Sequence, residues 1–386
     1  MFISDEQRRA RLAIRHGLAT PVATVEEAVR SVVCLHATEP ASVYLAAAVR
    51  ARCTREDIDA ALFENRSIVK QLAMRRTLFA FPRDLLGAVW GSASARVTAQ
   101  IGTRFAKDIE LGGLTGDGAA WLTEQTAAVK AAIASQPCDT AQMRQAVPEL
   151  DRRMVLAEGK AYESEVAVAN RAITVMAADG SIVRGINQGT WRSSRPLWTL
   201  ATDWLDEVPP VLNEAQGYRE LIGRWLAQFG PGTEDDIVWW LGATKSVVRR
   251  ALHDLEAIEV GTEAGPAYVL PDDAEPVTDP GPWAALLPVL DPTLMGWKQR
   301  DFYLGQHGGE LFDRNGNGGT TAWWGGRIVG GWHQSPEGEV IVDLLKDVGA
   351  EGRAALESQA QWWNSWLGGE VVGSVYHSPL TRRQMR

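Results

Sequence analysis

The sequence predicts an α+β protein made of three tandem winged-helix modules followed by a C-terminal β-barrel. The first observation is a recurring order of elements. Several helices and then a two-stranded hairpin, the order of a winged-helix module, occur three times before residue 275. The second is a change of pattern after an acidic, proline-rich stretch at residues 271–282, beyond which short strand-like runs alternate with Gly-rich turns. We therefore expect winged-helix modules at residues 1–105, 106–208 and 209–275, and a barrel with a terminal helix at residues 276–386.

Length and composition exclude several classes of protein. A chain of 386 residues is too long for one core. It has no apolar run long enough to span a bilayer, and its start lacks the pattern of a secretory signal. The cysteines (Cys34, Cys53 and Cys138) and the histidines show no metal-ligand spacing, so we expect a cytoplasmic protein with no metal and no other cofactor. The net charge of −9 argues against unselective binding to nucleic acid but is compatible with a local basic groove.

The first module begins with helices whose starts carry capping signals. Ser4, Thr24 and Thr54 each precede a helical pattern and have an acidic or amide residue three positions later, which is the form of a capping box. Strands are predicted at residues 67–74 and 77–81, so Arg75 and Arg76 fall at the turn of the first hairpin. A helix is expected from about residue 84.

The second module repeats this order. Helices are expected at residues 119–135, 140–147 and 161–178, followed by strands at 182–184 and about 190–191. Arg184, Arg192 and Arg195 lie on this expected hairpin, where a loop that contacts phosphates would need them.

The third module has the same order again. Helices are expected at residues 218–228, 233–241 and 244–255, and a hairpin at 258–260 and 267–270. Its last helix carries Lys245, Arg249 and Arg250 on or near one face. These residues are candidates for phosphate contacts, although such a stripe is also typical of a solvated helix face.

The C-terminal part has the pattern of closely spaced hairpins. Strands are expected at residues 310–312, 320–324, 327–329 and 339–345, then a helix at about 351–366 and a last strand near 371–376. Hairpins of this kind are typical of a small barrel.

The candidate active site is the stretch from Cys34 to Pro40. Pro40 suits the first turn of a helix and disfavours helical geometry at the residue before it, so we expect an extended segment that leads into a helix. Side chains two apart in an extended segment share a face. His36 and Thr38 would therefore point the same way, beside a helix N-terminus that favours a water or an anion. The alternative is that Thr38 or Glu39 caps the helix and His36 is a hydrogen-bonded core histidine.

The chain resembles the AlkZ-like family of winged-helix DNA glycosylases, which is related to azinomycin resistance and the unhooking of interstrand crosslinks. The resemblance rests on residues 34–40 (CLHATEP), 74–78 (MRRTL), 229–237 (FGPGTEDDI), 287–292 (LPVLDP), 312–317 (FDRNGN) and 326–332 (GRIVGGW). It implies tandem winged helices and a β-barrel around duplex DNA that carries alkyl adducts. No obligate protein partner is inferred from the sequence. The family's motif is typically Gln-x-Gln or Gln-x-Asp, and here the matching positions are His36 and Thr38.

Family resemblance implies hydrolysis of the N-glycosidic bond of an alkylated purine. Alkylation of a ring nitrogen makes the base cationic, so it can leave without protonation by an acid. The enzyme must then stabilise an oxocarbenium-like sugar and present a water to it. A neutral His36 could accept the proton of that water, with the Thr38 hydroxyl as helper and Glu39 as a structural residue or reserve base.

The departure from the family's amide pair leaves a second reading open. A protein that has lost hydrolysis would bind DNA as a lesion sensor or a transcription regulator. A small-molecule hydrolase is disfavoured because the sequence has no Gly-x-Ser-x-Gly motif and no phosphate-binding Gly loop. For either DNA reading, the expected phosphate contacts are Arg75, Arg76, Arg184, Arg192, Arg195, Lys245, Arg249 and Arg250.

Overall fold

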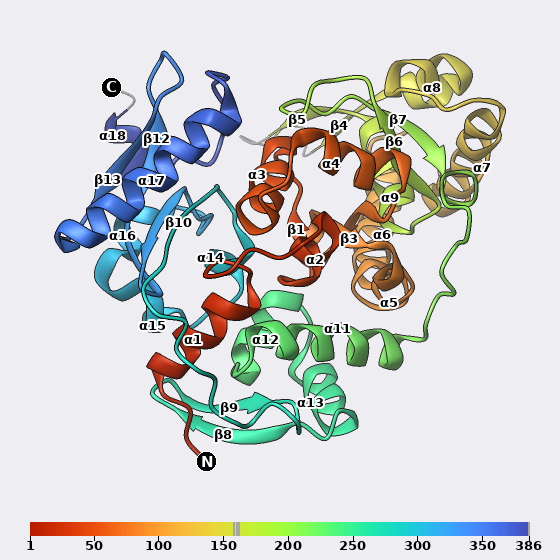
Figure 1. Cartoon of the computed structure of the whole chain (residues 1–386). Coiled ribbons are helices and arrows are strands. Elements are labelled where there is room, and N and C mark those ends of the chain that lie inside the picture. Colours follow the sequence, from red (N-terminus) through yellow and green to blue (C-terminus); the bar gives the residue numbers. More distant parts are fainter. Residues whose placement is uncertain (157–158, 160–162, 385–386) are drawn as a thin grey trace.

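The computed structural model describes residues 1–156, 159 and 163–384, and it combines helices with small antiparallel sheets (Figure 1). The predicted α+β class is therefore confirmed. In the described part of the chain the strands form a three-stranded sheet (β1-β3-β2), a four-stranded sheet (β10-β11-β12-β13) and three two-stranded hairpins. None of the described helices is both long and apolar enough to cross a membrane.

The N-terminal elements follow the predicted order. They are α1 (Asp5–Arg15), α2 (Val25–Arg30), β1 (Leu35–His36), α3 (Pro40–Ala51), α4 (Arg55–Asp59), β2 (Ile68–Ala73), β3 (Thr77–Pro82), α5 (Leu86–Val89) and α6 (Ala95–Leu111). The side chains of Ser4, Thr24 and Thr54 accept the expected backbone bonds at the starts of α1, α2 and α4. The predicted hairpin around Arg75 and Arg76 is confirmed, since β2 pairs antiparallel with β3.

The next region contains two errors of the sequence prediction. Its elements are α7 (Gly118–Ser135), α8 (Thr140–Ala146), β4 (Arg153–Leu156), β5 (Ser164–Ala167), α9 (Val168–Ala178), β6 (Ile182–Asn187), β7 (Pro196–Leu200) and α10 (Ala201–Trp204). The helix expected at residues 161–178 is wrong over residues 164–167, which pair with β4 as strand β5. Residues 161 and 162 of that prediction lie outside the described residues.

The strand expected near residues 190–191 is a turn, and the partner of β6 is β7. Short polar side chains bind the backbone there instead of leaving it free for a sheet. Asn187 Oδ1 accepts from the Arg195 amide at 2.7 Å, and Ser193 Oγ accepts from the Thr190 amide at 2.9 Å.

The third set of helices and hairpin has the predicted order. It consists of α11 (Glu214–Phe229), α12 (Glu234–Leu241), α13 (Lys245–Asp254), β8 (Ile258–Thr262) and β9 (Gly265–Val269). The following stretch at residues 271–282 contains no helix or strand, as expected of a linker. It is nevertheless fastened to α1, because Arg11 donates to the carbonyl oxygens of Asp273 at 2.9 Å and Glu275 at 2.7 Å.

The C-terminal part is an open sheet rather than the predicted barrel. Its elements are β10 (Ala284–Leu287), α14 (Pro292–Met295), α15 (Asp301–Leu304), α16 (Gly308–Leu311), β11 (Thr321–Trp324), β12 (Arg327–Gln334), β13 (Val340–Leu344), α17 (Gly349–Leu367) and α18 (Pro379–Gln384). Within the described residues, β10 and β13 are edges of the sheet, so no closed barrel forms. The helix α17 packs on both edge strands, and its side chains bind their backbone groups instead of leaving them free to pair. Trp363 Nε1 donates to the Leu286 carbonyl at 3.1 Å, and the Val340 amide donates to Asn364 Oδ1 at 2.7 Å.

Two further strand predictions in this part are wrong. Residues 308–311 are the short helix α16, where a strand was expected at 310–312. Residues 371–376 have no strand, because their backbone binds side chains rather than another strand. The amide of Val372 donates to Gln334 Oε1 at 2.9 Å, and the amide of Val375 donates to Glu39 Oε1 at 2.7 Å.

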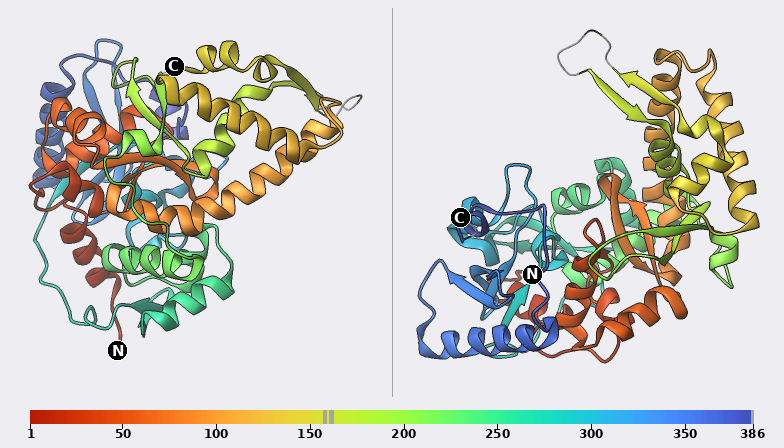
Figure 2. Two further views of the ribbon diagram at one scale, coloured as in Figure 1. Left: turned by 90° about the vertical axis from the view of Figure 1, so that its right-hand side faces the viewer. Right: turned by 90° about the horizontal axis from the view of Figure 1, so that it is seen from above.

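The buried apolar side chains form two large clusters. One unites the N-terminal elements, the α11–α13 region and the C-terminal sheet. The other belongs to the region from α6 to β7, which projects away from the remainder of the molecule in the right-hand view of Figure 2. The regions that meet in the first cluster are hundreds of residues apart in sequence, so the candidate site at β1 is built by distant segments.

Candidate functional site

The stretch from Leu35 to Pro40 has the predicted extended backbone. β1 pairs with β3 so that His36 lies opposite Phe79. Glu39 has φ −95° and ψ 123°, and Pro40 occupies the first turn of α3. Burial alternates along the segment: Leu35 is buried, His36 half-buried and Thr38 exposed. The more accessible side of the segment therefore carries the histidine and the threonine.

The imidazole of His36 is neutral and incompletely hydrogen-bonded. Its Nδ1 atom is buried without a hydrogen-bond partner in the described structure, and its ring packs edge-on to Phe79 at 5.2 Å between centroids. Burial, with a smaller effect of the positive charge of Arg75, lowers the pKa of His36 to about 3. An unpaired buried polar atom costs about 1–3 kcal/mol. Such an atom is uncommon in a purely structural histidine and is compatible with a functional one.

Glu39 anchors a C-terminal segment at the mouth of the site. It occupies the N-cap position of α3, but its side chain makes no capping hydrogen bond, so the alternative in which the Glu39 side chain caps this helix is wrong. Its Oε1 atom accepts from Ser374 Oγ at 2.8 Å and from the Val375 amide at 2.7 Å. Together with Thr38 and Arg192, these residues border an open hollow of about 440 Å³.

The same C-terminal segment is tied to the loop between β6 and β7. Glu370 accepts from Trp191 Nε1 at 3.0 Å and pairs with Arg192 at 3.1 Å. Arg192 also donates to the Val371 carbonyl. Arg192 lines the same hollow as Thr38, as a residue at the site would, but an acidic partner already engages it. Arg195 is exposed, and no ion pair involves it within the described ranges.

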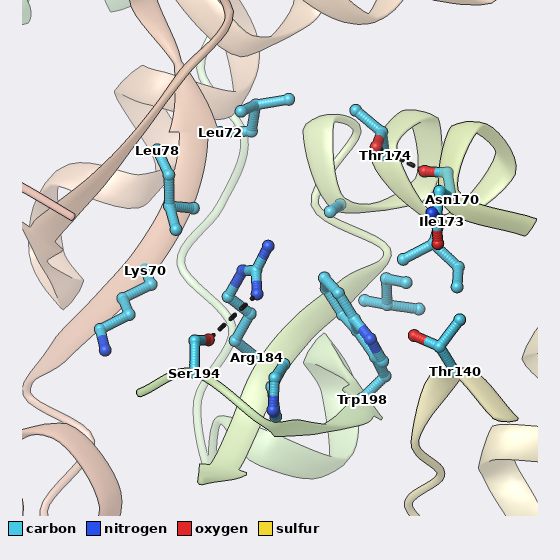
Figure 3. Close-up of a pocket in the computed structure, with 13 residues that line it drawn as sticks. Lys70, Leu72, Leu78, Thr140, Asn170, Ile173, Thr174, Arg184, Ser194 and Trp198 are labelled. Atoms are coloured by element: carbon cyan, nitrogen blue, oxygen red, sulfur yellow. Dashed lines mark hydrogen bonds between the residues drawn. The ribbon is translucent and has the colours of Figure 1, made fainter. Parts of the chain in front are cut away.

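Arg184 lies in a pocket rather than at the tip of a hairpin. Its guanidinium carbon is 4.7 Å from the ring centroid of Trp198, and Figure 3 shows it between Lys70 on one side and Trp198 on the other. The pocket measures about 350 Å³. Burial and the charge of Arg184 lower the pKa of Lys70 to about 8.

This pocket and His36 lie on opposite faces of the three-stranded sheet. Gln71 and His36 are both register partners of Phe79, so they share one face. Lys70, which lines the pocket, precedes Gln71 on β2 and points to the other face. The pocket is therefore separate from the candidate active site.

The basic residues of α13 are paired with acids. Lys245 pairs with Asp235 at 2.8 Å, and Arg249 pairs with Glu234 at 2.6 Å. Arg250 contacts Asp254 at 3.8 Å. The acidic first turn of α12 thus neutralises much of this stripe, as the solvated-face alternative predicts. A phosphate would have to compete with these carboxylates.

Arg75 and Arg76 form the exposed turn between β2 and β3. Sequence reasoning identified these two arginines but missed the residues packed around them. Trp239 of α12 stacks on Arg75, and Arg300 stacks on the same tryptophan. No sequence signal connects three positions so far apart. Among the described residues, no group of three or more His, Cys, Asp or Glu side chains is placed to hold a metal ion.

The chain shares its fold with a solved protein structure. Its structure is similar to that of the Streptomyces sahachiroi DNA glycosylase AlkZ, with a TM-score of 0.74 and 20% sequence identity over 96% of this chain and 99% of that chain. At this identity the match establishes a shared fold. A search of curated proteins finds no match.

The family follows from a separate comparison. The family model described as "DNA glycosylase AlkZ-like" matches residues 29–366, a range that includes β1, the β2–β3 turn and Arg300. The chain belongs to the AlkZ-like DNA glycosylase family.

Proposed function

We propose that this protein hydrolyses the N-glycosidic bond of alkylated purines, including bulky or crosslinking adducts, in duplex DNA. Family membership supports glycosylase activity. The observation that carries the proposal is the neutral, unpaired imidazole of His36 beside the exposed Thr38, at the junction of a strand and a helix N-terminus.

The chemistry requires little from the protein beyond placing a water and stabilising charge. An alkylated purine is already cationic, so no acid is needed for its departure. His36 would orient the attacking water by accepting a hydrogen bond from it, which a neutral imidazole can do and an imidazolium cannot. A pKa of about 3 makes this ring a weak base, so it favours the positioning role over proton abstraction. Thr38 would hold the same water through its hydroxyl. The two hydrogen bonds that Glu39 accepts favour a role as anchor of the C-terminal segment over a role as base.

The direct test is the formation of abasic sites on duplex DNA that carries a panel of alkyl adducts, analysed on gels after strand cleavage. Release of at least one alkylated purine by the wild-type protein supports the proposal. Tight binding to adducted DNA without base release would favour the alternative, a DNA-binding sensor or regulator in which residues 36 and 38 no longer support hydrolysis.

Protonation of His36 should not lower the rate of base release at any pH above about 5. The pKa of His36 is lowered from 6.5 to about 3, so the imidazole stays neutral through the physiological range. An NMR titration of the histidine ring protons, with His36→Gln to assign the signal, measures this directly. A ring that titrates near pH 6.5 would contradict it.

The lowered pKa of His36 also makes the stability of the fold depend on pH. Between about pH 6.5 and pH 3 the unfolded chain binds a proton at this histidine and the folded chain does not, so the free energy of unfolding falls as the pH falls. His36→Gln should make this decline shallower. His16, whose pKa burial also lowers, should leave a remaining slope in both proteins.

DNA binding should depend on the loop between β6 and β7. Replacing Arg192 and Arg195 with Glu should weaken duplex binding and reduce the slope of log K against log salt by about 2, since roughly 0.9 counterions are released per phosphate contact. The measurement is a binding series over several salt concentrations.

Arg144→Glu is the matched control, because Arg144 is exposed on α8 and pairs with Asp151 at 2.7 Å. The single variant Arg195→Glu separates a lost phosphate contact from the loss of the contact between Arg192 and Glu370. Unchanged affinity and slope in the double variant would remove this loop from the interface.

A further inference from the structure

Two arginines stack on one tryptophan where three distant parts of the chain meet. The guanidinium carbon of Arg75, in the β2–β3 turn, lies 4.4 Å from the ring centroid of Trp239 on α12. That of Arg300, at the start of α15, lies 5.1 Å from the same ring and 4.7 Å from the ring of Phe312. We propose that these residues, the Arg75–Trp239–Arg300 cluster, bind a backbone phosphate of duplex DNA next to His36. The proposal rests on the DNA-binding part of the proposed function.

The backbone holds Arg300 in place before any ligand binds. Asp236, fully buried, closes the capping box of α12 with Thr233. Its Oδ1 atom also accepts from the amides of Lys298 and Gln299, both at 2.8 Å. One carboxylate therefore fixes the residues before Arg300 onto the helix that carries Trp239.

The turn geometry holds Arg75 from the other side. Arg75 has φ 54°, in the left-handed region, so the β2–β3 turn directs this side chain in a defined way. It lies against Gly242, the residue that ends α12, where a Cβ would come within 3.1 Å of Arg75 Cγ. Both guanidinium groups are thus positioned by backbone features.

Within the described residues, the cluster combines two arginines on one ring with the lack of an acidic partner. Arg52 on Trp362 and Arg184 on Trp198 also lack an ion pair, but each is a single arginine on its ring. Other stacked arginines have an acid. Arg8 stacks on Phe302 and pairs with Asp5 at 3.1 Å, and Arg171 stacks on Phe105 and pairs with Asp108 at 2.6 Å. Neither Arg75 nor Arg300 has a carboxylate within 4.0 Å in the part of the chain that the structure describes.

Instead, the two charges of the cluster repel each other. Arg75 is exposed at the turn, but the groups packed around its guanidinium partly desolvate it. This desolvation, and then the charge of Arg300, lower the pKa of Arg75. The partial negative charge at the C-terminal end of α12 offsets part of the free-energy cost of holding the Arg75 charge there. A bound anion would offset the remainder.

Phosphodiester is the anion that fits the location. Guanidinium groups bind phosphate oxygens through paired N–H donors, and arginine keeps its charge when partly desolvated. Arg75 lies in the turn that leads into β3, and His36 pairs with Phe79 of that strand, so the cluster is near the histidine. The charge of Arg75 also lowers the pKa of His36. A phosphate held here would belong to a nucleotide close to the bond that His36 is proposed to help hydrolyse.

The first experiment measures duplex binding by Arg300→Gln over a range of salt. The expected result is a slope shallower by about 1 and an affinity about tenfold weaker at low salt. Arg224→Gln removes the same charge from an arginine that pairs with Glu220 at 2.8 Å, and it should bind as wild type does. Arg300→Lys should keep most of the slope, since it keeps the charge. If Arg300→Gln does not fold, Arg75→Gln is measured in its place, and the same decrease in slope and affinity is expected.

The second experiment locates the phosphate. Adducted duplexes that carry one neutral methylphosphonate at successive positions near the lesion are titrated with wild type and Arg300→Gln. A methylphosphonate at the phosphate bound by the cluster should weaken duplex binding by the wild-type protein. It should leave the affinity of the Arg300→Gln variant unchanged, because that variant has already lost the contact. The proposal is overturned if two results occur together. No methylphosphonate position behaves in this way, and inorganic phosphate at constant ionic strength competes with duplex binding only when Arg300 is present. The cluster would then be a site for free phosphate.

Base release by the wild-type protein is measured in parallel and separates the two proposals. No base release, with a salt slope that still depends on Arg300, would overturn the glycosylase function and support the cluster. Normal base release, with the same slope for wild type and Arg300→Gln, would overturn the cluster and support the function.

Discussion

Replacing His36 with alanine should lower the rate of base release by about 10²-fold, the usual cost of misplacing a reacting group, here the attacking water. Binding of adducted duplex and the folded structure should be nearly unchanged, because a group that acts on the attacking water stabilises the transition state more than the DNA complex. Single-turnover kinetics on an adduct that the wild type releases, with a separate binding titration, measures both quantities.

The matched control is His253→Ala, since His253 is exposed on α13 and far from β1 in the sequence. Its rate should equal the wild-type rate. Thr38→Ala should cost only about fivefold, the equivalent of one neutral hydrogen bond of about 1 kcal/mol, because another water can replace a hydroxyl that only assists. Wild-type rates in His36→Ala would show that this imidazole takes no part in hydrolysis.

Asp291→Ala should lower the free energy of unfolding by about 3–5 kcal/mol, the largest effect on stability that we expect of a single change. Arg50 on α3 and Asp291 at the start of α14 form a two-pronged ion pair, with N–O distances of 2.7 and 2.8 Å, and both side chains are fully buried. The alanine variant leaves the guanidinium buried without its carboxylate. It also removes the acceptor for the Thr293 amide at the start of α14. Urea denaturation measures the loss.

The control for this effect is an ion pair of the same length on the surface. Arg144 and Asp151 are also 2.7 Å apart, but their side chains are 47% and 62% exposed. Asp151→Ala should therefore cost about 0–1 kcal/mol. Arg50→Met combined with Asp291→Leu should recover part of the loss, since it leaves no unpaired charge. A cost for Asp291→Ala similar to that for Asp151→Ala would mean that the buried pair contributes little.

The sequence by itself determined the features that depend on neighbours a few residues apart. Thr24 and Thr54 start helices because their side chains bind amides three residues later. Pro40 fixes an extended segment before it and a helix after it, and this placed His36 and Thr38 on the more accessible side of β1. The hairpin around Arg75 follows from two strand patterns on either side of a turn. Each of these signals is complete within about ten residues.

Only the tertiary structure decided which strands pair and which charges find partners. Residues 164–167 have a helical pattern but pair with β4, and the C-terminal sheet stays open because α17 packs on both of its edge strands. Glu39 binds the amide of Val375, 336 positions away, and Arg50 pairs with Asp291, 241 positions away. The charges of Arg75 and Arg300, by contrast, meet on Trp239, and none of the acidic side chains that the structure describes pairs with them. The energies of sheet closure, ion pairing and desolvation are set by groups that folding brings together, and no local pattern records their positions.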